Sequence, residues 1–168
     1  MLVAVAGQPV SLAGSLRPAR DGRVIHLLTR FDRRWVQIAW TRVGRHGGFT
    51  FHYPAPRGGS EPLRVSAYGN SGSWPVSAPA GDLVSLQPTV ASWYDDAGGT
   101  ACGFHAFYGV ANKTLPCGTS VVISYGGRTV VATVDDRGPF VPGRTYDLNQ
   151  NTRAALGMDG VQMVFASV

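Results

Sequence analysis

Residues 109–148 read GVANKTLPCGTSVVISYGGRTVVATVDDRGPFVPGRTYDL and contain the features that decide the fold and the candidate chemistry. A strand-like apolar run ends in the carboxylate pair Asp135 and Asp136, a Gly-Pro turn follows at once, and a third carboxylate stands at Asp147. An acid/base site needs carboxylates that rigid elements hold in place, and strand ends beside stiff turns provide such a frame. The stretch therefore predicts a carboxylate site at the end of a buried strand.

The second half of the chain has the pattern of a small closed β-barrel. Gly126 and Gly127 are a tight hairpin signal between two of its predicted strands. A short helix fits residues 149–156, since Asn149 is able to cap its start and Gly157 its end. The predicted strands are 90–94, 110–112, 120–125, 129–135, 145–148 and 162–166. This number of strands, with one helix in about 80 residues, is typical of a small closed barrel.

The first half predicts an antiparallel β-sandwich, immunoglobulin-like or fibronectin-like, over residues 1–78. Alternating apolar residues and evenly spaced turns give predicted strands at 10–16, 24–28, 35–43, 48–53 and 63–68. Residues 79–88 (PAGDLVSLQP) are bounded by prolines and lack strong periodicity, so they are predicted to be a linker. The second domain is then 89–168, and the fold class of the whole chain is all-β.

The composition, with 44% hydrophobic residues, 22 Gly and 11 Pro, is that of a globular chain with many turns. Its charge is unevenly distributed. Residues 1–88 hold ten Arg against four acidic residues, a net +6, whereas residues 89–168 hold five basic and six acidic residues, a net −1. A basic first half suits an anionic surface such as a bacterial wall, or nucleic acid, or is simply a solvated surface. No zinc finger, helix-turn-helix or basic-aromatic repeat is visible, so nucleic acid is not an expected partner.

Cys102 and Cys117 are the only cysteines, and a disulfide between them would close a loop of about 16 residues, worth roughly 3 kcal/mol. A pair of reduced core thiols is the alternative. No CxxC pair is present and the four histidines are scattered, so no metal site is expected. Residues 1–10 lack the basic start and the length of a secretory signal, and no apolar run approaches the ~20 residues of a membrane helix. We expect that an export signal has been removed or lies upstream of this chain.

Several short motifs of the second half resemble those of the rare lipoprotein A family. They are TACG at 100–103, KTLPCGT at 113–119, DRGPF at 136–140, GR and DL within 143–148, and LG at 156–157. That family has a double-psi β-barrel, resembles the expansins and contains septal lytic transglycosylases of bacteria. The resemblance covers residues 90–168 and implies a secreted or wall-located bacterial protein that cleaves the glycan strands of peptidoglycan without a cofactor. Peptidoglycan or another wall polysaccharide is the expected partner, the chain is expected to be a monomer, and an even number of cysteines fits an oxidising compartment.

Asp136 is the first catalytic candidate, because the resemblance implies a general acid/base role for the Asp of DRGPF. Strand alternation puts Asp136 on the side of Val134 and Asp135 on the other, and partial burial there would raise the pKa of Asp136. The alternative is structural, with Asp136 accepting hydrogen bonds from the turn that follows or pairing with Arg144. Asp147 takes the place of an Asp in expansins and related glycosidases and is the supporting or alternative acid, or else a charge that suits the dipole of the next helix. A lytic transglycosylase needs only one acid, because a hydroxyl of the muramic acid itself attacks.

The candidate substrate-binding residues surround these carboxylates in the sequence motifs. Trp93 and Tyr94 match a WY pair of the family, and aromatic rings in a groove stack on sugar faces, although most aromatic residues of so small a barrel belong to its core. The full set is Trp93, Tyr94, Asn112, Lys113, Thr114, Arg137, Phe140 and Arg144.

Three positions depart from the family pattern. Asn112 stands where catalytic members have the His that cleavage needs, and an amide supplies no proton at neutral pH. Phe104 stands where an acidic or amide residue is usual, and Asp95 stands where Gly is usual, while His105 is a nearby candidate to compensate. Asn112 and Phe104 favour a second interpretation, a non-catalytic expansin-like module that binds or loosens wall polysaccharide. A secreted protein-binding or inhibitor domain, like some plant relatives of the fold, is the third.

Overall fold

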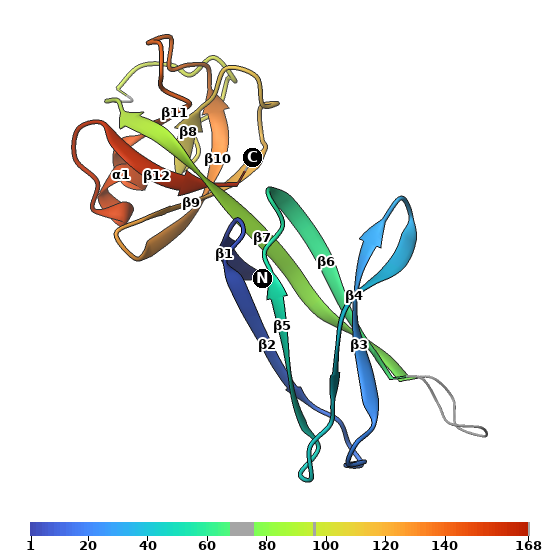
Figure 1. Ribbon diagram of the computed structural model, residues 1–168. Coiled ribbons are helices and arrows are strands. Elements are labelled where there is room, and N and C mark those ends of the chain that lie inside the picture. Colours follow the sequence, from blue (N-terminus) through green and yellow to red (C-terminus); the bar gives the residue numbers. More distant parts are fainter. Residues whose placement is uncertain (68–75, 96, 168) are drawn as a thin grey trace. The chain divides into compact units, whose positions relative to one another are not determined.

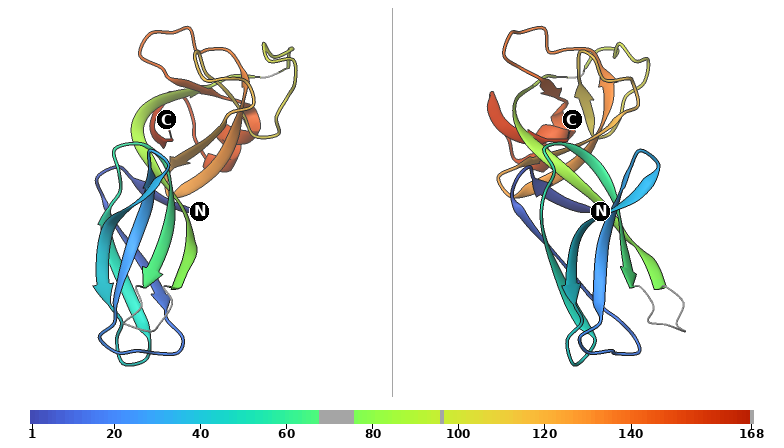
Figure 2. Two further views of the ribbon diagram at one scale, coloured as in Figure 1. Left: turned by 90° about the vertical axis from the view of Figure 1, so that its right-hand side faces the viewer. Right: turned by 45° about the vertical axis from the view of Figure 1, so that its right-hand side comes forward.

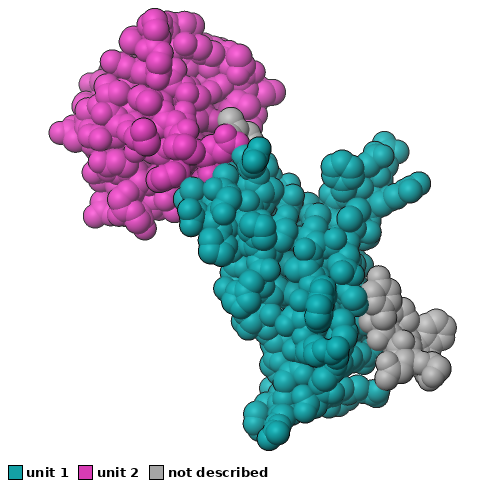
Figure 3. All heavy atoms as spheres, viewed as in Figure 1, with its two compact units in different colours: residues 1–85 teal, residues 86–168 magenta. Residues whose placement is uncertain are grey.

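The computed structural model describes residues 1–67, 76–95 and 97–167 and consists mainly of β-strands with one short helix (Figure 1). The chain divides into two compact units, Met1–Ser85 and Leu86–Val168, here named unit 1 and unit 2 (Figure 3). No helix of the described residues is long and apolar enough to cross a membrane.

Unit 1 is built from strands close to the places where the sequence predicts them. β2 (Pro9–Ser15) and β5 (Gly48–Pro54) form a two-stranded antiparallel sheet and lie side by side in both views of Figure 2. The second sheet has the order β4 (Arg34–Arg42), β3 (Val24–Phe31), β6 (Gly59–Ala67) and the first part of β7 (Val76–Trp93). A further strand, β1 (Leu2–Val5), pairs with β7 and is absent from the sequence-based prediction. The last residue of the predicted strand 63–68 lies outside the described residues.

An apolar core lies between the two sheets of unit 1. Phe51 of β5 and Leu27 of β3 are each 1% exposed, and Leu63 of β6 belongs to the same buried cluster. Alternate residues of these strands point into the core, as the two-residue period of a strand requires. Unit 1 is thus a small two-sheet unit, and its classification as immunoglobulin-like or fibronectin-like stays a prediction.

Residues 79–88, the predicted linker, lie inside β7 and not in a separate connecting segment. β7 pairs with β6 in unit 1 and, further along, with β12 (Gln162–Ala166) in unit 2. Prolines lower the expectation of a strand because they donate no backbone hydrogen bond. Here Pro79 lies beside a bulge, where the register between β7 and β6 shifts, and such positions tolerate proline.

Unit 2 is a closed ring of six strands, as the sequence predicts. Besides the end of β7 and β12, it contains β8 (Gly109–Ala111), β9 (Ser120–Tyr125), β10 (Arg128–Asp136) and β11 (Tyr146–Leu148). Around the ring the order is β7, β11, β8, β10, β9, β12 and β7 again. The pairs β7–β11 and β8–β10 are parallel, and the other pairs are antiparallel.

Local signals in the sequence set the ends of elements in unit 2. Gly126 and Gly127, with φ of 57° and 78°, turn β9 into β10, which confirms the predicted hairpin. The helix α1 (Gln150–Leu156) begins after Asn149, whose side chain accepts a hydrogen bond of 2.9 Å from a backbone N–H in the first turn. It ends at Gly157, whose φ of 65° is left-handed, so the predicted helix and both of its caps are confirmed.

The inside of the ring is the core of unit 2. Val110, Val134, Leu148 and Val164, from four different strands, are completely buried there. Side chains alternate along a strand, so the residues next to these point to the outer face of the ring. The candidate site lies on that outer face.

Candidate active site on the outer face of the barrel

A row of four residues crosses the outer face on the neighbouring strands β10, β8, β11 and β7. Asp136 is aligned with Ala111, Ala111 with Asp147, and Asp147 with Ser92. Leu148, the residue after Asp147, lies in the core, so the row faces away from the core. At the usual strand spacing, the Cα atoms of Asp136 and Asp147 are about 10 Å apart, since β8 lies between them. The structure therefore brings the two predicted catalytic carboxylates together on one face.

A β-bulge places Asp136 in this row. Val134 is aligned with Val110 and Asp136 with Ala111, so Asp135 is the extra residue between two aligned pairs. Regular alternation predicts Asp136 on the side of Val134, inside the ring, and the extra residue moves it to the outer face instead. The apolar alternation runs unbroken up to Val134, so the sequence pattern carries no signal of the bulge.

The two carboxylate oxygens of Asp136 have different surroundings. Oδ1 accepts hydrogen bonds from the backbone N–H of Ala101, at 2.7 Å, and of Arg137, at 2.8 Å. Oδ2 accepts no hydrogen bond from the described residues and is not buried. The protein thus fixes one oxygen of the half-buried carboxylate and leaves the other open to a ligand.

Asp147 has the environment of a proton donor. Burial raises the pKa of Asp147 above its ordinary value, the Ser92 hydroxyl and the Arg144 guanidinium lower it, and the charge of Asp136 raises it again. Burial is the largest of these effects, so the pKa of Asp147 is raised. Oδ1 of Asp147 and Oγ of Ser92 are buried, and neither forms a hydrogen bond of good geometry with the described residues. Asp147 therefore keeps its proton to a higher pH than an exposed aspartate, which favours a role as proton donor.

Asp135, the first carboxylate of the pair but not one of the predicted catalytic residues, anchors the loop of residues 100–108. It is completely buried, and its Oδ2 accepts a hydrogen bond of 2.8 Å from the backbone N–H of Ala106. Burial raises the pKa of Asp135, and the Ala106 N–H lowers it. Gly109 lies so close to this carboxylate that an added Cβ would collide with it. The DD pair is thus divided in its tasks, with Asp135 holding the loop and Asp136 presenting an oxygen on the surface.

The loop beside Asp136 is also held covalently. The predicted disulfide between Cys102 and Cys117 is present, with Cα atoms 5.7 Å apart, and it ties the loop of residues 100–108 to the loop after β8. Asn149, the cap of α1, donates hydrogen bonds from Nδ2 to two carbonyl oxygens of the same loop, at 3.1 and 3.2 Å. The backbone N–H that binds Asp136 therefore comes from a firmly positioned segment.

Asn112, predicted to bind substrate, holds the turn of the KTLP motif. It is 5% exposed, and its Oδ1 accepts hydrogen bonds from the backbone N–H of Leu115, at 2.8 Å, and of Thr114, at 3.0 Å. The hydroxyl of Thr114 also lies 3.4 Å from Oδ1. Nδ2 of Asn112 donates to the carbonyl oxygen of Thr145 at 3.1 Å. Both amide atoms thus have protein partners, and the amide serves the turn.

Arg137 is engaged in the same turn. Its Nη1 donates to the carbonyl oxygens of Leu115, at 2.7 Å, and Asn112, at 3.1 Å, and its Nη2 donates to Sγ of Cys117 at 3.0 Å. These contacts connect the end of β10 with the disulfide-bonded loop. Through them Arg137 supports the position of the preceding carboxylate.

Three other predicted binding residues are more accessible. Lys113 is exposed, and its ammonium group forms no hydrogen bond or ion pair with the described residues. Phe140, at the end of the DRGPF motif, is 79% exposed. Arg144 is half-buried, and its charge acts on Asp147. These side chains are available to a ligand that approaches the carboxylates.

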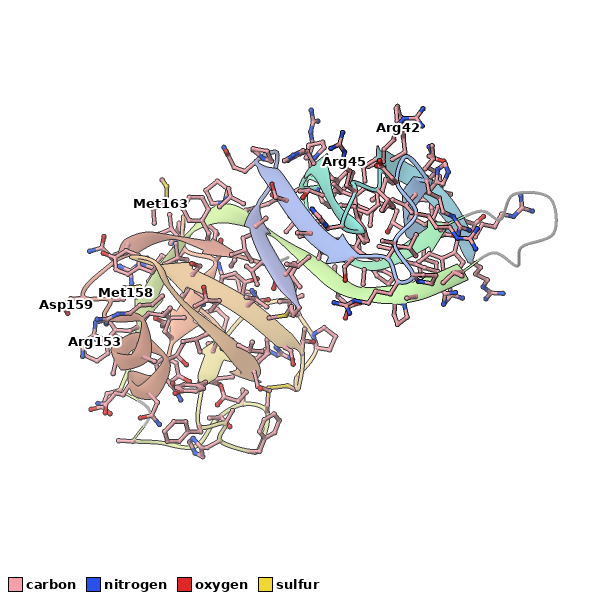
Figure 4. All side chains as sticks on the ribbon, turned by 90° about the horizontal axis from the view of Figure 1, so that it is seen from below. Arg42, Arg45, Arg153, Met158, Asp159 and Met163 are labelled. Atoms are coloured by element: carbon pink, nitrogen blue, oxygen red, sulfur yellow. A yellow bond between two sulfur atoms is a disulfide. The ribbon has the colours of Figure 1, made fainter. Side chains whose placement is uncertain are left out.

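Trp93 faces the core of the ring, whereas the carboxylates lie on its outer face. It is aligned with Leu148 and packs against the core, and the guanidinium carbon of Arg153 lies 4.3 Å from its ring centroid. Arg153 in turn forms an ion pair of 3.0 Å with Asp159, both labelled in Figure 4. The next residue, Tyr94, donates its backbone N–H to Leu148 at 2.9 Å. Trp93 therefore ends β7, and Tyr94 follows it with its backbone bonded to β11.

The arrangement as a whole is suited to proton transfer. It combines a carboxyl with a raised pKa, Asp147, with a second carboxylate that has one open oxygen, Asp136. Such a pair is able to protonate a leaving oxygen and to accept a proton from an attacking hydroxyl. Within residues 1–67, 76–95 and 97–167, no group of three His, Cys, Asp or Glu is placed to hold a metal ion.

The sequence of unit 2 is similar to those of known proteins. The profile of the family described as Lytic transglycolase matches residues 87–165. A probable endolytic peptidoglycan transglycosylase RlpA of Aquifex aeolicus is 39% identical in an alignment of 82 positions, which covers 42% of this chain and 36% of the relative. Proteins of the same name from Synechocystis and Nostoc are 33% identical over 88 residues and 44% identical over 52 residues. They are matched over 47% and 30% of this chain and over 27% and 14% of their own lengths.

Residues 87–165 are thus similar in sequence to the Lytic transglycolase family and to these relatives. The chain spans between 14% and 36% of the length of the three relatives named. A solved structure, the Streptomyces papain inhibitor (SPI), is similar with a TM-score of 0.39 and 25% identity, over 48% of this chain and 93% of that chain.

Proposed function

We propose that unit 2 cleaves the glycan strands of peptidoglycan by a lytic transglycosylase mechanism, with Asp136 as general acid/base. The observation that carries the proposal is the pairing of Asp136, with one oxygen open, and Asp147, with a raised pKa, on one face of the ring. The similarity of residues 87–165 to the Lytic transglycolase family and to the peptidoglycan transglycosylases named RlpA supports the choice of substrate.

The reaction needs one proton donated and one accepted. Asp136, carrying a proton on Oδ2, gives it to the glycosidic oxygen as the bond from that oxygen to the anomeric carbon of the muramic acid breaks. The hydroxyl at carbon 6 of the same muramic acid then bonds to the anomeric carbon, and its proton returns to Asp136. The products are a 1,6-anhydro-muramic acid end and a free hydroxyl on the departing sugar, so no water is consumed.

Asp147 assists by keeping a proton near the reacting carboxyl. The pKa of Asp147 is raised by burial and, to a smaller extent, by the charge of Asp136. Asp147 therefore retains its proton more readily than an exposed aspartate does. Arg144, which acts on Asp147 by its charge, limits the rise of the pKa.

A second function is favoured by one observation, the role of Asn112. Both atoms of its amide are bound within the KTLP turn, so this position supplies neither a proton nor a free polar group. If cleavage requires a second basic or acidic group at this place, unit 2 is an expansin-like module that binds or loosens wall polysaccharide without covalent chemistry. Either function belongs to the cell wall, an oxidising surrounding that agrees with the disulfide.

The test compares purified protein with Asp136→Asn and a matched control, Asp159→Asn, on peptide-stripped glycan strands. Asp159 is an exposed aspartate of unit 2 that pairs with Arg153, away from the row of carboxylates. Mass spectrometry of the products is expected to find anhydro-muramic acid ends with the parent and the control, and at least about 100-fold fewer with Asp136→Asn, the usual range for a lost general acid. If neither the parent nor the control releases such ends but both sediment with the wall, the binding function is correct.

A further inference from the structure

One face of unit 1 carries exposed tryptophans among arginines. The register of β3 with β4 aligns Arg30 with Trp35 and His26 with Trp40, and the register of β3 with β6 aligns Leu28 with Arg64. Aligned residues point to the same side of a sheet, and so do alternate residues of one strand. We name this surface the Trp–Arg face. Its members are Arg30, Trp35, Gln37, Trp40, Arg42 and Arg64.

A bulge in β4 brings the two tryptophans to the same side. Leu27 is aligned with Ala39 and Leu28 with Gln37, so one extra residue of β4 lies between these pairs. Trp35 and Trp40 are five positions apart and would face opposite sides of a regular strand. With the bulge both point outward, about 13 Å apart along the strand at the usual rise.

The tryptophans of this face are accessible and supported by polar neighbours. Trp40 is 59% exposed and Trp35 is 40% exposed. The guanidinium carbon of Arg64 lies 4.6 Å from the ring centroid of Trp35, which fixes one face of that ring. Nδ1 of His26 and Oε1 of Gln37 are hydrogen-bonded at 2.5 Å between the two rings. Tryptophan is enriched at interaction sites because its ring is apolar and its N–H is a hydrogen-bond donor.

The charge of the face indicates what it binds. Unit 1 has a net positive charge, since residues 1–88 hold ten Arg and four acidic residues. Three of these arginines, Arg30, Arg42 and Arg64, belong to the Trp–Arg face, and Arg42 is labelled in Figure 4. Guanidinium groups pair with carboxylate and phosphate groups, and an indole ring stacks on the C–H face of a sugar. The ligand that matches both features is an extended sugar polymer that carries negative charges.

We propose that the Trp–Arg face binds an anionic glycan polymer of the cell wall, with the sugar rings on Trp35 and Trp40 and the anionic groups on the surrounding arginines. The choice of a wall polymer over a nucleic acid rests on the proposed function of unit 2, which acts on wall glycan. The face then holds the protein at its substrate, independently of the carboxylates that cleave it.

The experiment measures binding of the full chain to purified peptidoglycan that keeps its anionic polymers, to the same material after these polymers are extracted, and to oligo(dT). The test variant is Trp35→Ala with Trp40→Ala, and the matched control is Val36→Ala, an exposed residue of the same strand that points to the opposite side. A second variant, Arg30→Gln with Arg42→Gln, keeps both rings and removes two charges. Circular dichroism checks that every variant is folded.

The parent is expected to bind the native material more tightly than the extracted one, and more weakly as NaCl rises, because salt screens exposed charges. The tryptophan variant is expected to bind about tenfold more weakly, the loss of one or two stacked rings, and Val36→Ala to bind as the parent does. The arginine variant is expected to lose most of the difference between native and extracted material. Should the tryptophan variant fail to fold, Trp40→Ala alone gives the same comparison.

Unchanged binding by folded tryptophan and arginine variants overturns the proposal, and so does tighter binding to oligo(dT) than to the wall material. Cleavage is measured in parallel on short soluble glycan strands. If the tryptophan variant loses binding but the parent cleaves nothing, the proposed function fails and the binding face stands. If the parent cleaves the strands and the tryptophan variant binds the wall material as tightly as the parent, the proposed function stands and the proposed binding role of the Trp–Arg face is wrong.

Discussion

Replacement of Asn112 by Ala tests whether this residue is structural. The change removes the acceptor for the N–H groups of Leu115 and Thr114 and the donor to the carbonyl oxygen of Thr145. Each such hydrogen bond contributes about 1 kcal/mol net, and partners left unpaired in a buried place add to the loss. Asn112 is 5% exposed, so water does not easily replace its amide. We expect unit 2 to lose about 3 kcal/mol of unfolding free energy.

The assay follows backbone amide signals of β8 and β11 by NMR during urea unfolding, since these strands report on unit 2 alone. Lys113→Ala is the matched control, because Lys113 is next to Asn112 in the sequence and its side chain is exposed. We expect the unfolding free energy of this variant to change by no more than about 0.5 kcal/mol. A loss below about 1 kcal/mol for Asn112→Ala, similar to the control, would refute the reasoning. Asn112 would then be free to serve as the ligand-binding residue that the sequence motif suggests.

Three further outcomes follow from the structure. Burial raises the pKa of Asp135 and Asp147 in the folded state. Just above the ordinary aspartate pKa, the folded protein therefore binds more protons than the unfolded chain, and the unfolding free energy should fall as the pH rises through this range. In Asp135→Asn this fall should be smaller. Arg33 has a φ of 63° in the β3–β4 hairpin, a conformation that glycine adopts at no steric cost, so Arg33→Gly should raise the midpoint of urea unfolding of unit 1 by the equivalent of about 1 kcal/mol. Replacing Cys102 and its disulfide partner by Ala should cost unit 2 about 3 kcal/mol in the same assay, and no loss would mean that the unfolded chain does not profit from the opened loop.

Much of unit 2 was predictable because its signals are local. The Gly126 and Gly127 hairpin, the Asn149 cap and the Gly157 end each require only neighbouring residues, and each is found as expected. The closing of the ring follows from the number and spacing of the strands. The disulfide between the two cysteines is the one long-range contact that composition alone suggests.

The site was less predictable, because it depends on interactions between distant segments. The bulge at Asp135 arises where β10 pairs with β8, and no pattern within β10 announces it. Because of this bulge, Asp136 lies on the outer face and not on the inner face that the alternation predicts. Asp135 accepts a hydrogen bond from the backbone N–H of Ala106. Asn112 combines local contacts to Thr114 and Leu115 with a contact from Nδ2 to Thr145, 33 positions away, and the motif does not reveal this last one.

In unit 1 and in residues 79–88, the sequence predicted the presence of strands better than it predicted where they begin and end. Prolines suggested a linker at residues 79–88, but pairing with β6 and β12 extends a strand through them. Tertiary pairing outweighs a local preference in such cases. The outward position of Trp40 likewise depends on the bulge opposite β3, which the alternation of β4 alone does not reveal.

The most direct test of the central claim is the mass of the products formed from peptide-stripped glycan strands in water enriched in oxygen-18. An intramolecular attack within the muramic acid predicts anhydro ends without the label from the parent protein, and loss of these products with Asp136→Asn. Labelled reducing ends would mean that water attacks and that unit 2 is a hydrolase. Intact strands with the parent would mean that the two carboxylates on the outer face do not cleave glycan.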